Sequence, residues 1–306
     1  MIESQSRESA LVDWLMSRKP HGDFLDVGIG DDMAVLRFGN RRILLSSDML
    51  LDGVHFDTTQ HAPADIGRKA IACSLSDCAA MAAVPRGATL SIAYTKGTSL
   101  ADLQQLIEGA DALAHEFAFD VSGGDTTAWD KPLAIDVAVV AEPAHSDRVV
   151  LRSDAQVGDD IYVTGRLGGS IFGRHITFKP RIVEAGCMVA ALGDDLHAMI
   201  DVTDGLALDL HRVCKASNCG AQLNGDALVS VAAPECVTDA KGVEQMMIHH
   251  VLYDGEDFEL LFTVARGCEL PATVSATRIG RVTASGLALE DKSGHTHPIE
   301  PKGYLH

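Results

Sequence analysis

The chain has few basic residues, few aromatic residues and no long apolar run. Its 25 Lys and Arg residues stand against 43 Asp and Glu residues, which gives a formal charge of −18 over 306 residues. Such a charge disfavours binding to nucleic acid or to an anionic membrane. No apolar stretch reaches the roughly 18 residues that cross a bilayer, and residues 1–19 mix acids, bases and apolar residues, unlike a secretory signal. We therefore expect a cytoplasmic protein with no nucleic-acid or membrane partner.

The common nucleotide-binding motifs are missing as well. The chain contains no Gly-Lys dipeptide, which excludes a Walker A loop. Gly28-Ile29-Gly30 is followed by Asp-Asp-Met, so the G-x-G-x-x-G fingerprint is not completed, and neither H-R-D nor D-F-G occurs. If this protein handles ATP, it does so through another architecture.

The seven cysteines do not form the pattern of a disulfide framework or a zinc site. Their number is odd, their spacing is scattered and no C-x-x-C pair occurs. We expect them to be buried free thiols, which behave as small apolar side chains.

Segments of helical and strand character alternate along the chain, which indicates an α/β or α+β class. The length suggests about two domains, and the polar stretch at 142–147 is the best boundary, which divides the chain into residues 1–143 and 144–306. Apolar spacing predicts helices at 3–18, 63–83, 99–117, 181–192 and 206–217, and strands at 34–38, 41–47, 88–94, 133–140, 160–164, 198–202, 258–264 and 277–282.

Acidic residues recur at the predicted ends of helices and strands. The clusters are Gly30-Asp31-Asp32, Ser46-Ser47-Asp48, Ser76-Asp77, Gly123-Gly124-Asp125-Thr126-Thr127, Asp201-Val202-Thr203-Asp204-Gly205 and Gly255-Glu256-Asp257. Any one of them can be an ordinary turn or helix cap, and most acidic residues are expected to form a solvated surface. Together the clusters offer the carboxylate oxygens that Mg²⁺ prefers, with small hydroxyls and glycines beside them.

These clusters resemble the motifs of thiamine-monophosphate kinases, and the resemblance covers nearly the whole chain in family order and spacing. The matching segments are Gly28-Ile29-Gly30-Asp31-Asp32, Ser47-Asp48, Gly53-Val54-His55-Phe56, Ser76-Asp77-Cys78-Ala79-Ala80-Met81, 123–127, 158–165, Lys179-Pro180-Arg181, 201–206, 255–260 and Lys302-Gly303-Tyr304. This joint match is far more specific than any single motif.

The resemblance implies the two-domain α/β fold shared with aminoimidazole ribonucleotide synthetase. In that fold the N-terminal domains pair across a homodimer, so that their sheets form a β-barrel. Here the strands at 34–47 and 88–94 would supply the interface. The implied reaction converts ATP and thiamine phosphate into ADP and thiamine diphosphate with the help of several Mg²⁺ ions. Since the second pKa of a phosphate monoester is about 6, the acceptor oxygen is already largely ionised and needs no general base.

The resemblance also implies roles for individual residues. The metal ions would be held by Asp32, Ser46, Ser47, Asp48, Asp77, Asp125, Asp201 and Asp204. Among these, Asp48, Asp125 and Asp204 would be the catalytic carboxylates. The nucleotide would contact Gly124, Asp125, Arg152 and Thr203, and thiamine phosphate would contact His55, Glu256 and the position of Pro301.

Some positions depart from the family pattern. Thr203 replaces a serine, Asp254 replaces a glycine and adds negative charge by the substrate pocket, and Pro301 replaces an aromatic residue that would pack on the thiamine rings. The link between Gly169 and Pro180 is short. Two other interpretations therefore stay open: a kinase of the same fold with another phosphorylated acceptor, and an acidic metal-binding protein without catalysis.

Overall fold

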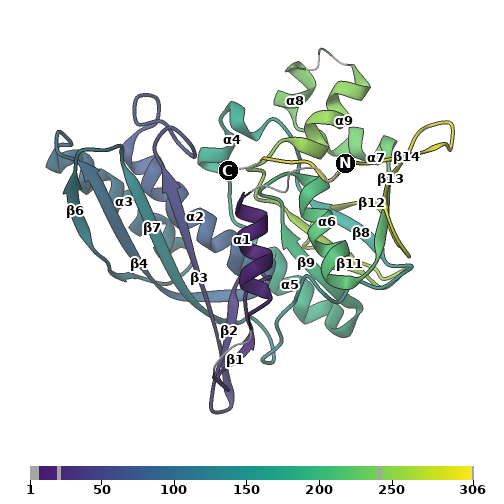
Figure 1. Cartoon of the computed structure of the whole chain (residues 1–306), viewed down its shortest axis with the longest axis horizontal. Coiled ribbons are helices and arrows are strands. Elements are labelled where there is room, and N and C mark those ends of the chain that lie inside the picture. The colour runs from purple at the N-terminus through teal and green to yellow at the C-terminus, as the bar shows by residue number, and fades with distance from the viewer. Residues whose placement is uncertain (1–6, 19–21, 240, 242, 305–306) are drawn as a thin grey trace.

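The computed structural model describes residues 7–18, 22–239, 241 and 243–304. Within this part, the chain forms two seven-stranded sheets that lie side by side, the first built from residues up to Pro143 and the second from Asp160 onward (Figure 1). The α/β character expected from the sequence is confirmed. No helix among the described residues combines the length and the apolar character that crossing a membrane requires.

The first sheet has the order β1-β2-β3-β7-β4-β5, and β6 also pairs with β4. Its strands are β1 (Leu25–Val27), β2 (Ala34–Phe38), β3 (Arg41–Leu51), β4 (Ala83–Thr95), β5 (Val121–Gly123), β6 (Thr126–Trp129) and β7 (Ala134–Pro143). Neighbours are antiparallel, except that β5 and β6 run parallel to β4. In β7 every second residue, including Ile135, Val137 and Val139, is buried, as the period of a strand requires.

Two helices, α2 (Pro63–Ala80) and α3 (Leu100–Glu116), cover one face of this sheet (Figure 1). They approach each other closely because glycines lie at the contact. A Cβ atom on Gly67 would lie 1.8 Å from the Leu106 carbonyl oxygen, and one on Gly109 would lie 1.9 Å from that of Ala64. No side chain fits at either position.

The opposite face of the first sheet carries exposed apolar side chains, among them Leu45, Met49, Leu51 and Val140. The sheet is open within one chain, and the described residues form no closed barrel. The barrel expected from the family resemblance is therefore not a property of the single chain.

The second sheet has the order β14-β13-β10-β12-β8-β11-β9. Its strands are β8 (Asp160–Thr164), β9 (Leu196–Asp201), β10 (Gly220–Asn224), β11 (Leu260–Val264), β12 (Ala276–Thr283), β13 (Leu287–Glu290) and β14 (Thr296–Pro298). All neighbours are antiparallel except β10 and β13. Its helices are α4 (Arg174–Thr177), α5 (Ile182–Leu192), α6 (Leu206–Ser217), α7 (Gly225–Val231), α8 (Pro234–Asp239) and α9 (Glu244–Tyr253).

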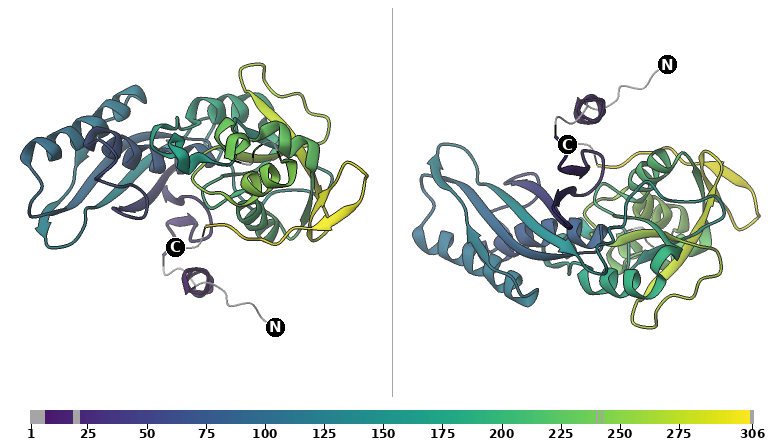
Figure 2. Two further views of the ribbon diagram at one scale, coloured as in Figure 1. Left: turned by 90° about the horizontal axis from the view of Figure 1, so that it is seen from above. Right: turned by 90° about the horizontal axis from the view of Figure 1, so that it is seen from below.

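The hydrophobic core of the first sheet continues into the second half of the chain. Met188 of α5 and Phe262 of β11 belong to the same buried cluster as Leu75 of α2. The first helix, α1 (Arg7–Met16), lies over the junction of the two sheets, where Figure 2 views it nearly end-on. The predicted start of this helix at residues 3–6 lies outside the described part of the chain.

The predicted elements are found, with shifted ends. The helix predicted at 63–83 ends at Ala80, because Ala82 adopts a left-handed φ of 51° and β4 begins at Ala83. The strand predicted at 258–264 begins only at Leu260, because Phe258 also has a positive φ. The cysteines are free thiols as expected. Three are buried, namely Cys78, Cys214 and Cys236, whereas Cys73, Cys187, Cys219 and Cys268 are only partly buried.

Candidate active site

Three carboxylates converge where the two sheets meet. Asp32 lies in the turn before β2, Asp77 in the last turn of α2 and Asp201 at the end of β9. Each offers one oxygen atom, and these three atoms lie within 4.8 Å of one another. Within the described part of the chain, this is the one group of three or more acidic, imidazole or thiol side chains with such spacing. Tertiary structure thus brings together three of the predicted metal ligands.

The side chain of Asp48, on β3, faces the same cluster. Burial raises the pKa of Asp77 and Asp201 well above the usual value, and the neighbouring carboxylates raise it further. Burial likewise raises the pKa of Asp48. Two hydroxyls of α2 partly compensate, since Ser74 Oγ donates to Asp48 Oδ2 (2.7 Å) and Ser76 Oγ donates to Asp201 Oδ2.

This cluster fits a hard divalent cation such as Mg²⁺. Crowded, buried carboxylates destabilise one another's charged forms, and the Ser46 hydroxyl is buried beside Asp77 without a hydrogen bond of good geometry. Mg²⁺ takes carboxylate and neutral oxygens as ligands. The residues that would hold it are therefore Asp32, Asp77 and Asp201, with Asp48 and Ser46 beside them.

Arg152 provides the positive charge at the edge of the cluster. Its Nε donates to Asp32 Oδ2 (3.1 Å), its Nη2 forms an ion pair with Asp32, and its backbone nitrogen donates to Asp31 Oδ2 (3.2 Å). Burial, followed by the charge of Asp32, raises the pKa of Asp31 to about 7. Arg152, which the resemblance assigns to the nucleotide, thus pairs directly with a candidate metal ligand.

Strand alternation separates Ser47 from Ser46 and Asp48. Successive residues of β3 face opposite sides of the sheet, so Ser46 and Asp48 face α2 whereas Ser47 lies on the open side. There Ser47 Oγ donates to Asp136 Oδ1 (2.8 Å). Asp136 was not predicted as a site residue, although a carboxylate inside the apolar strand β7 is a signal that could have found it.

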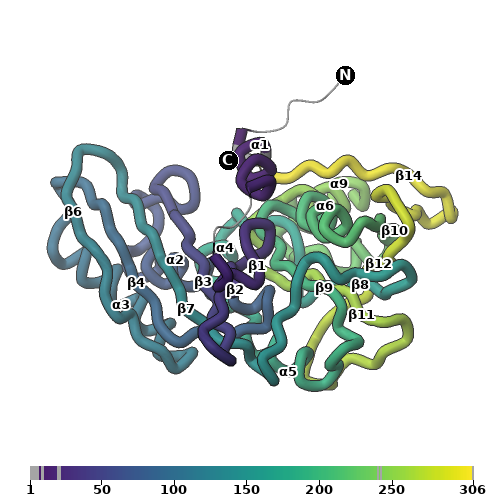
Figure 3. The backbone as a smooth tube through the Cα atoms, turned by 60° about the horizontal axis from the view of Figure 1, so that its bottom comes forward, coloured from purple at the N-terminus to yellow at the C-terminus, as the bar shows by residue number. Residues whose placement is uncertain are grey.

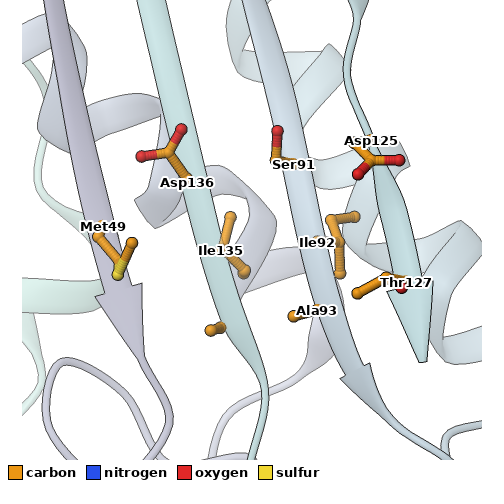
Figure 4. Close-up of a pocket in the computed structure, with 9 residues that line it drawn as sticks. Met49, Ser91, Ile92, Ala93, Asp125, Thr127, Ile135 and Asp136 are labelled. Atoms are coloured by element: carbon orange, nitrogen blue, oxygen red, sulfur yellow. The ribbon is translucent and has the colours of Figure 1, made fainter. Parts of the chain in front are cut away.

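Asp125 lies on the same open face, in a hollow of about 180 Å³ that Asp136 and Ser91 also line (Figure 4). The chain reaches this place by passing close to β4. A Cβ atom on Gly124, whose φ is 154°, would lie 1.8 Å from the Leu90 carbonyl oxygen. Only glycine fits at position 124, because any side chain would clash with the backbone of β4. This close approach places Asp125 in the hollow and not in the three-carboxylate cluster.

The loop after β9 is organised by a residue that sequence reasoning missed. Asp209, in the first turn of α6, accepts hydrogen bonds on Oδ2 from the backbone nitrogens of Thr203 (3.0 Å), Asp204 (3.1 Å) and Gly205 (3.2 Å). Arg212 forms ion pairs with both Asp204 and Asp209. An acidic residue in the first helical turn after Asp-Gly is the signal, because such residues commonly satisfy free N–H groups there.

Lys69 joins the two predicted substrate residues. It is 0% exposed on α2, and its Nζ donates to the His55 carbonyl oxygen (2.5 Å) and to both carboxylate oxygens of Glu256 (2.9 and 3.1 Å). His175 lies nearby, where burial and then the charge of Lys69 lower its pKa to about 4. A lysine within the Ala-rich helix α2 was the available signal, but an isolated lysine is usually read as surface-exposed.

After β14 the chain runs back from the outer edge of the second sheet to the junction (Figure 3). Tyr304 N donates to the Asp204 carbonyl oxygen (2.8 Å), and a Cβ atom on Gly303 would lie 2.1 Å from that oxygen. The tail thus lies beside the Asp204 loop. Pro301, which lies two residues before Gly303, is exposed.

Asp254, which was expected to add charge to the substrate pocket, has partners of its own. Its Oδ2 accepts from Gly169 N (2.8 Å) and lies 2.9 Å from His250 Nδ1. The side chain thereby ties the end of α9 to the turn that opens the link between Gly169 and Pro180.

Comparison with known proteins agrees with this architecture. Residues 30–142 match the N-terminal domain of AIR synthase related proteins, and residues 156–292 match their C-terminal domain. The chain is 33% identical to the thiamine-monophosphate kinase of Rhodopirellula baltica over 98% of this chain and 97% of that one, and 30% identical to the same-named protein of Bacillus subtilis over 98% and 99%. The solved structure of AaThiL complexed with AMPPCP and TMP covers 100% of both chains with a TM-score of 0.83 and 24% identity, a likeness of fold.

Proposed function

The chain belongs to the thiamine-monophosphate kinase family, and from that premise we propose that it transfers a phosphoryl group from ATP to thiamine phosphate, giving ADP and thiamine diphosphate. The observation that carries this proposal is the convergence of Asp32, Asp77 and Asp201 from both halves of the chain. A site rich in carboxylates suits a reaction between two polyanions, whose repulsion is relieved by cations. The fold of AaThiL, which was solved with AMPPCP and TMP, supports the same assignment.

In the proposed mechanism, Asp32, Asp77 and Asp201 would hold Mg²⁺, which would supply positive charge to offset the charge of the ATP phosphate groups. The chain's own residues set up this site: Ser76 orients Asp201, and Arg152 limits the net charge at Asp32. The ionised oxygen of the acceptor phosphate attacks the γ-phosphorus in line. A new P–O bond forms as the bond to the β,γ-bridging oxygen breaks, and ADP leaves with that electron pair.

We divide the roles between residues 1–143, which would bind ATP and a second copy, and residues 144–306, which would complete the substrate site. The exposed Leu45, Met49 and Val140 on the open face of the first sheet favour a homodimer with a barrel formed across the interface. The hollow that contains Asp125 lies on this face and would be closed by the partner. Sedimentation of an active monomer would contradict the dimer.

A second candidate is a kinase of the same fold with another phosphorylated acceptor. It is favoured by Pro301, which is exposed and offers no aromatic face for a thiamine ring. Both candidates predict ADP release that depends on an added phosphate acceptor.

The test is a screen of phosphorylated metabolites for Mg²⁺-dependent ADP release, with products identified by mass spectrometry. Formation of thiamine diphosphate from thiamine phosphate is the expected result. Use of a different phosphate alone would select the second candidate. Mg²⁺ binding without ADP release from any acceptor would indicate a metal-binding protein without catalysis.

A further inference from the structure

We propose that Lys69 is a positioning residue that locks the two acceptor-binding loops together and compensates the charge of Glu256. The proposal rests on the proposed function, in which His55 and Glu256 face the acceptor. The three N–H bonds of the Lys69 ammonium group are matched by three acceptors, the His55 carbonyl oxygen and the two oxygens of Glu256. Lys69 therefore acts on the acceptor through these two residues.

The loops that Lys69 joins come from different halves of the chain. His55 follows β3 of the first sheet, whereas Glu256 lies between α9 and β11 of the second. A side chain of one helix can fix the relative position of these two loops only if the helix packs against both halves of the chain. α2 meets this condition, because Ile71 and Leu75 lie in a core that extends to Phe262 of β11.

The Glu256 loop has a backbone that must be held in place. Glu256 and Phe258 have φ values of 60° and 51°, in the left-handed region that side-chain-bearing residues rarely adopt. The Glu256 nitrogen donates to the Thr203 carbonyl oxygen (2.6 Å) and the Phe258 nitrogen to that of Val202 (2.8 Å). Both acceptors directly follow β9, which carries Asp201 of the three-carboxylate cluster. The Lys69–Glu256 ion pair is thus a side-chain anchor of a strained loop next to Asp201.

The position of Lys69 on α2 also fixes its distance from Asp77 of the three-carboxylate cluster. Lys69, Cys73 and Asp77 recur at intervals of four residues, so they lie on one face of the helix. Burial raises the pKa of the Cys73 thiol, the charge of Lys69 lowers it, and the charge of Asp77 raises it. Cys73 thus lies close to both residues. At the rise of an α-helix, Lys69 and Asp77 are about 12 Å apart along the axis. One face of α2 therefore presents the carboxylate cluster at one point and the acceptor loops two turns away.

This arrangement separates acceptor binding from the phosphoryl donor. Without Lys69, Glu256 would lose the buried ammonium group that offsets its charge. More negative charge would then face an anionic acceptor, and the loop would lose one of its anchors. ATP, bound at the other end of α2, would be less affected. Loss of Lys69 should therefore raise the Michaelis constant for the acceptor much more than that for ATP.

The experiment compares Lys69→Met, Glu256→Gln and the double variant, with Lys292→Met as the control that breaks an exposed Lys–Glu pair. Michaelis constants for thiamine phosphate and ATP are measured, and backbone amide exchange is followed in the free proteins. Lys69→Met should raise the Michaelis constant for thiamine phosphate about tenfold, which lies within the roughly 2- to 160-fold range for residues in contact. It should change the constant for ATP less than about twofold. Exchange should accelerate at 254–258 and 53–56.

The double variant should bind thiamine phosphate better than Lys69→Met alone, because Glu256→Gln removes the negative charge that Lys69 no longer offsets. Lys69 does not position the loop if the fold-changes of the two single variants in the Michaelis constant for thiamine phosphate multiply in the double variant. The same conclusion follows if amide exchange at 254–258 is unchanged in Lys69→Met. If Lys69→Met does not fold, Glu256→Gln decides by the same exchange measurement, in which faster exchange is again expected. If the wild type does not use thiamine phosphate, the proposed function fails, whereas amide exchange in the free protein still tests the lock.

Discussion

Ser76 of α2 donates its hydroxyl hydrogen to the carboxylate of Asp201 at the end of β9, so a helix of the first sheet holds a candidate metal ligand of the second. Burial raises the pKa of Asp201 and this hydrogen bond lowers it. Ser76→Ala should therefore weaken Mg²⁺ binding by about 10- to 100-fold, the usual effect of removing a partner of a metal ligand. A Mg²⁺ titration of ADP formation measures it, and Ser230→Ala, which removes a surface hydroxyl bonded to Ala227 O, is the control. An unchanged titration would contradict the metal-site assignment.

Asp77→Asn should stabilise the metal-free protein and abolish its stabilisation by Mg²⁺. The substitution removes one of several buried carboxylates that raise one another's pKa, but it also removes a ligand. Thermal unfolding with Mg²⁺ and with chelator measures both effects. Asp120→Asn, at a side chain that is 84% exposed, should change neither. A variant that Mg²⁺ still stabilises like the wild type would show that Asp77 is not a ligand.

Asp48→Asn and Asp125→Asn should each lower turnover by about 10²-fold or more while the fold is kept, since each removes a charge assigned to the site of phosphoryl transfer. The two residues lie on opposite sides of the first sheet, so the variants test the cluster and the hollow separately. Near-normal turnover of Asp125→Asn at saturating Mg²⁺ would confine the site to the cluster side. Steady-state kinetics, with circular dichroism as the check on folding, distinguishes the outcomes.

Metal-free protein should lose stability as pH rises from about 4 to 7. Burial raises the pKa of Asp31, Asp209 and Asp257 to about 7 in the folded state, whereas an unfolded Asp titrates near about 3.9. Between these values the folded state binds more protons than the unfolded state, so the free energy of unfolding falls with rising pH. Denaturant titrations at pH 5 and 7.5 in chelator measure it. Asp257→Asn should reduce the difference in the free energy of unfolding between pH 5 and pH 7.5 by on the order of 2 kcal/mol. A free energy of unfolding that rises with pH over this interval would contradict the prediction.

Pro301→Trp should lower the Michaelis constant for thiamine phosphate. Pro301 is exposed, and the tail after it is fixed beside Asp204 through Tyr304 N, so an aromatic ring there could cover the substrate. Stacking contributes roughly 0.5–1.5 kcal/mol, or about 2- to 12-fold in affinity. Turnover should hardly change, because the ring is remote from the reacting phosphate. A constant that stays the same or rises would mean that position 301 does not face the acceptor.

The regular elements were predictable where the sequence has a clear period. The alternation of β7 and the apolar spacing of α6 give both elements near their observed bounds. The short strands β5, β6 and β14, each of three or four residues, were missed, because so few residues cannot display a period. They are strands because β4 and β13 offer them hydrogen bonds, which is a property of the assembled sheet.

The acidic turns, with their order and spacing along the sequence, were enough to indicate the family through its resemblance to thiamine-monophosphate kinases. Which of these carboxylates meet depends on tertiary packing. Ser76 and Asp201 are 125 residues apart, and Lys69 and Glu256 are 187 apart. Local periodicity describes which side of an element a residue takes, but contact across such separations depends on how α2 packs between the two sheets. Packing also distinguishes Asp77, which joins the three-carboxylate cluster, from Asp125, which looks equivalent in the local sequence but lies in the hollow on the open face.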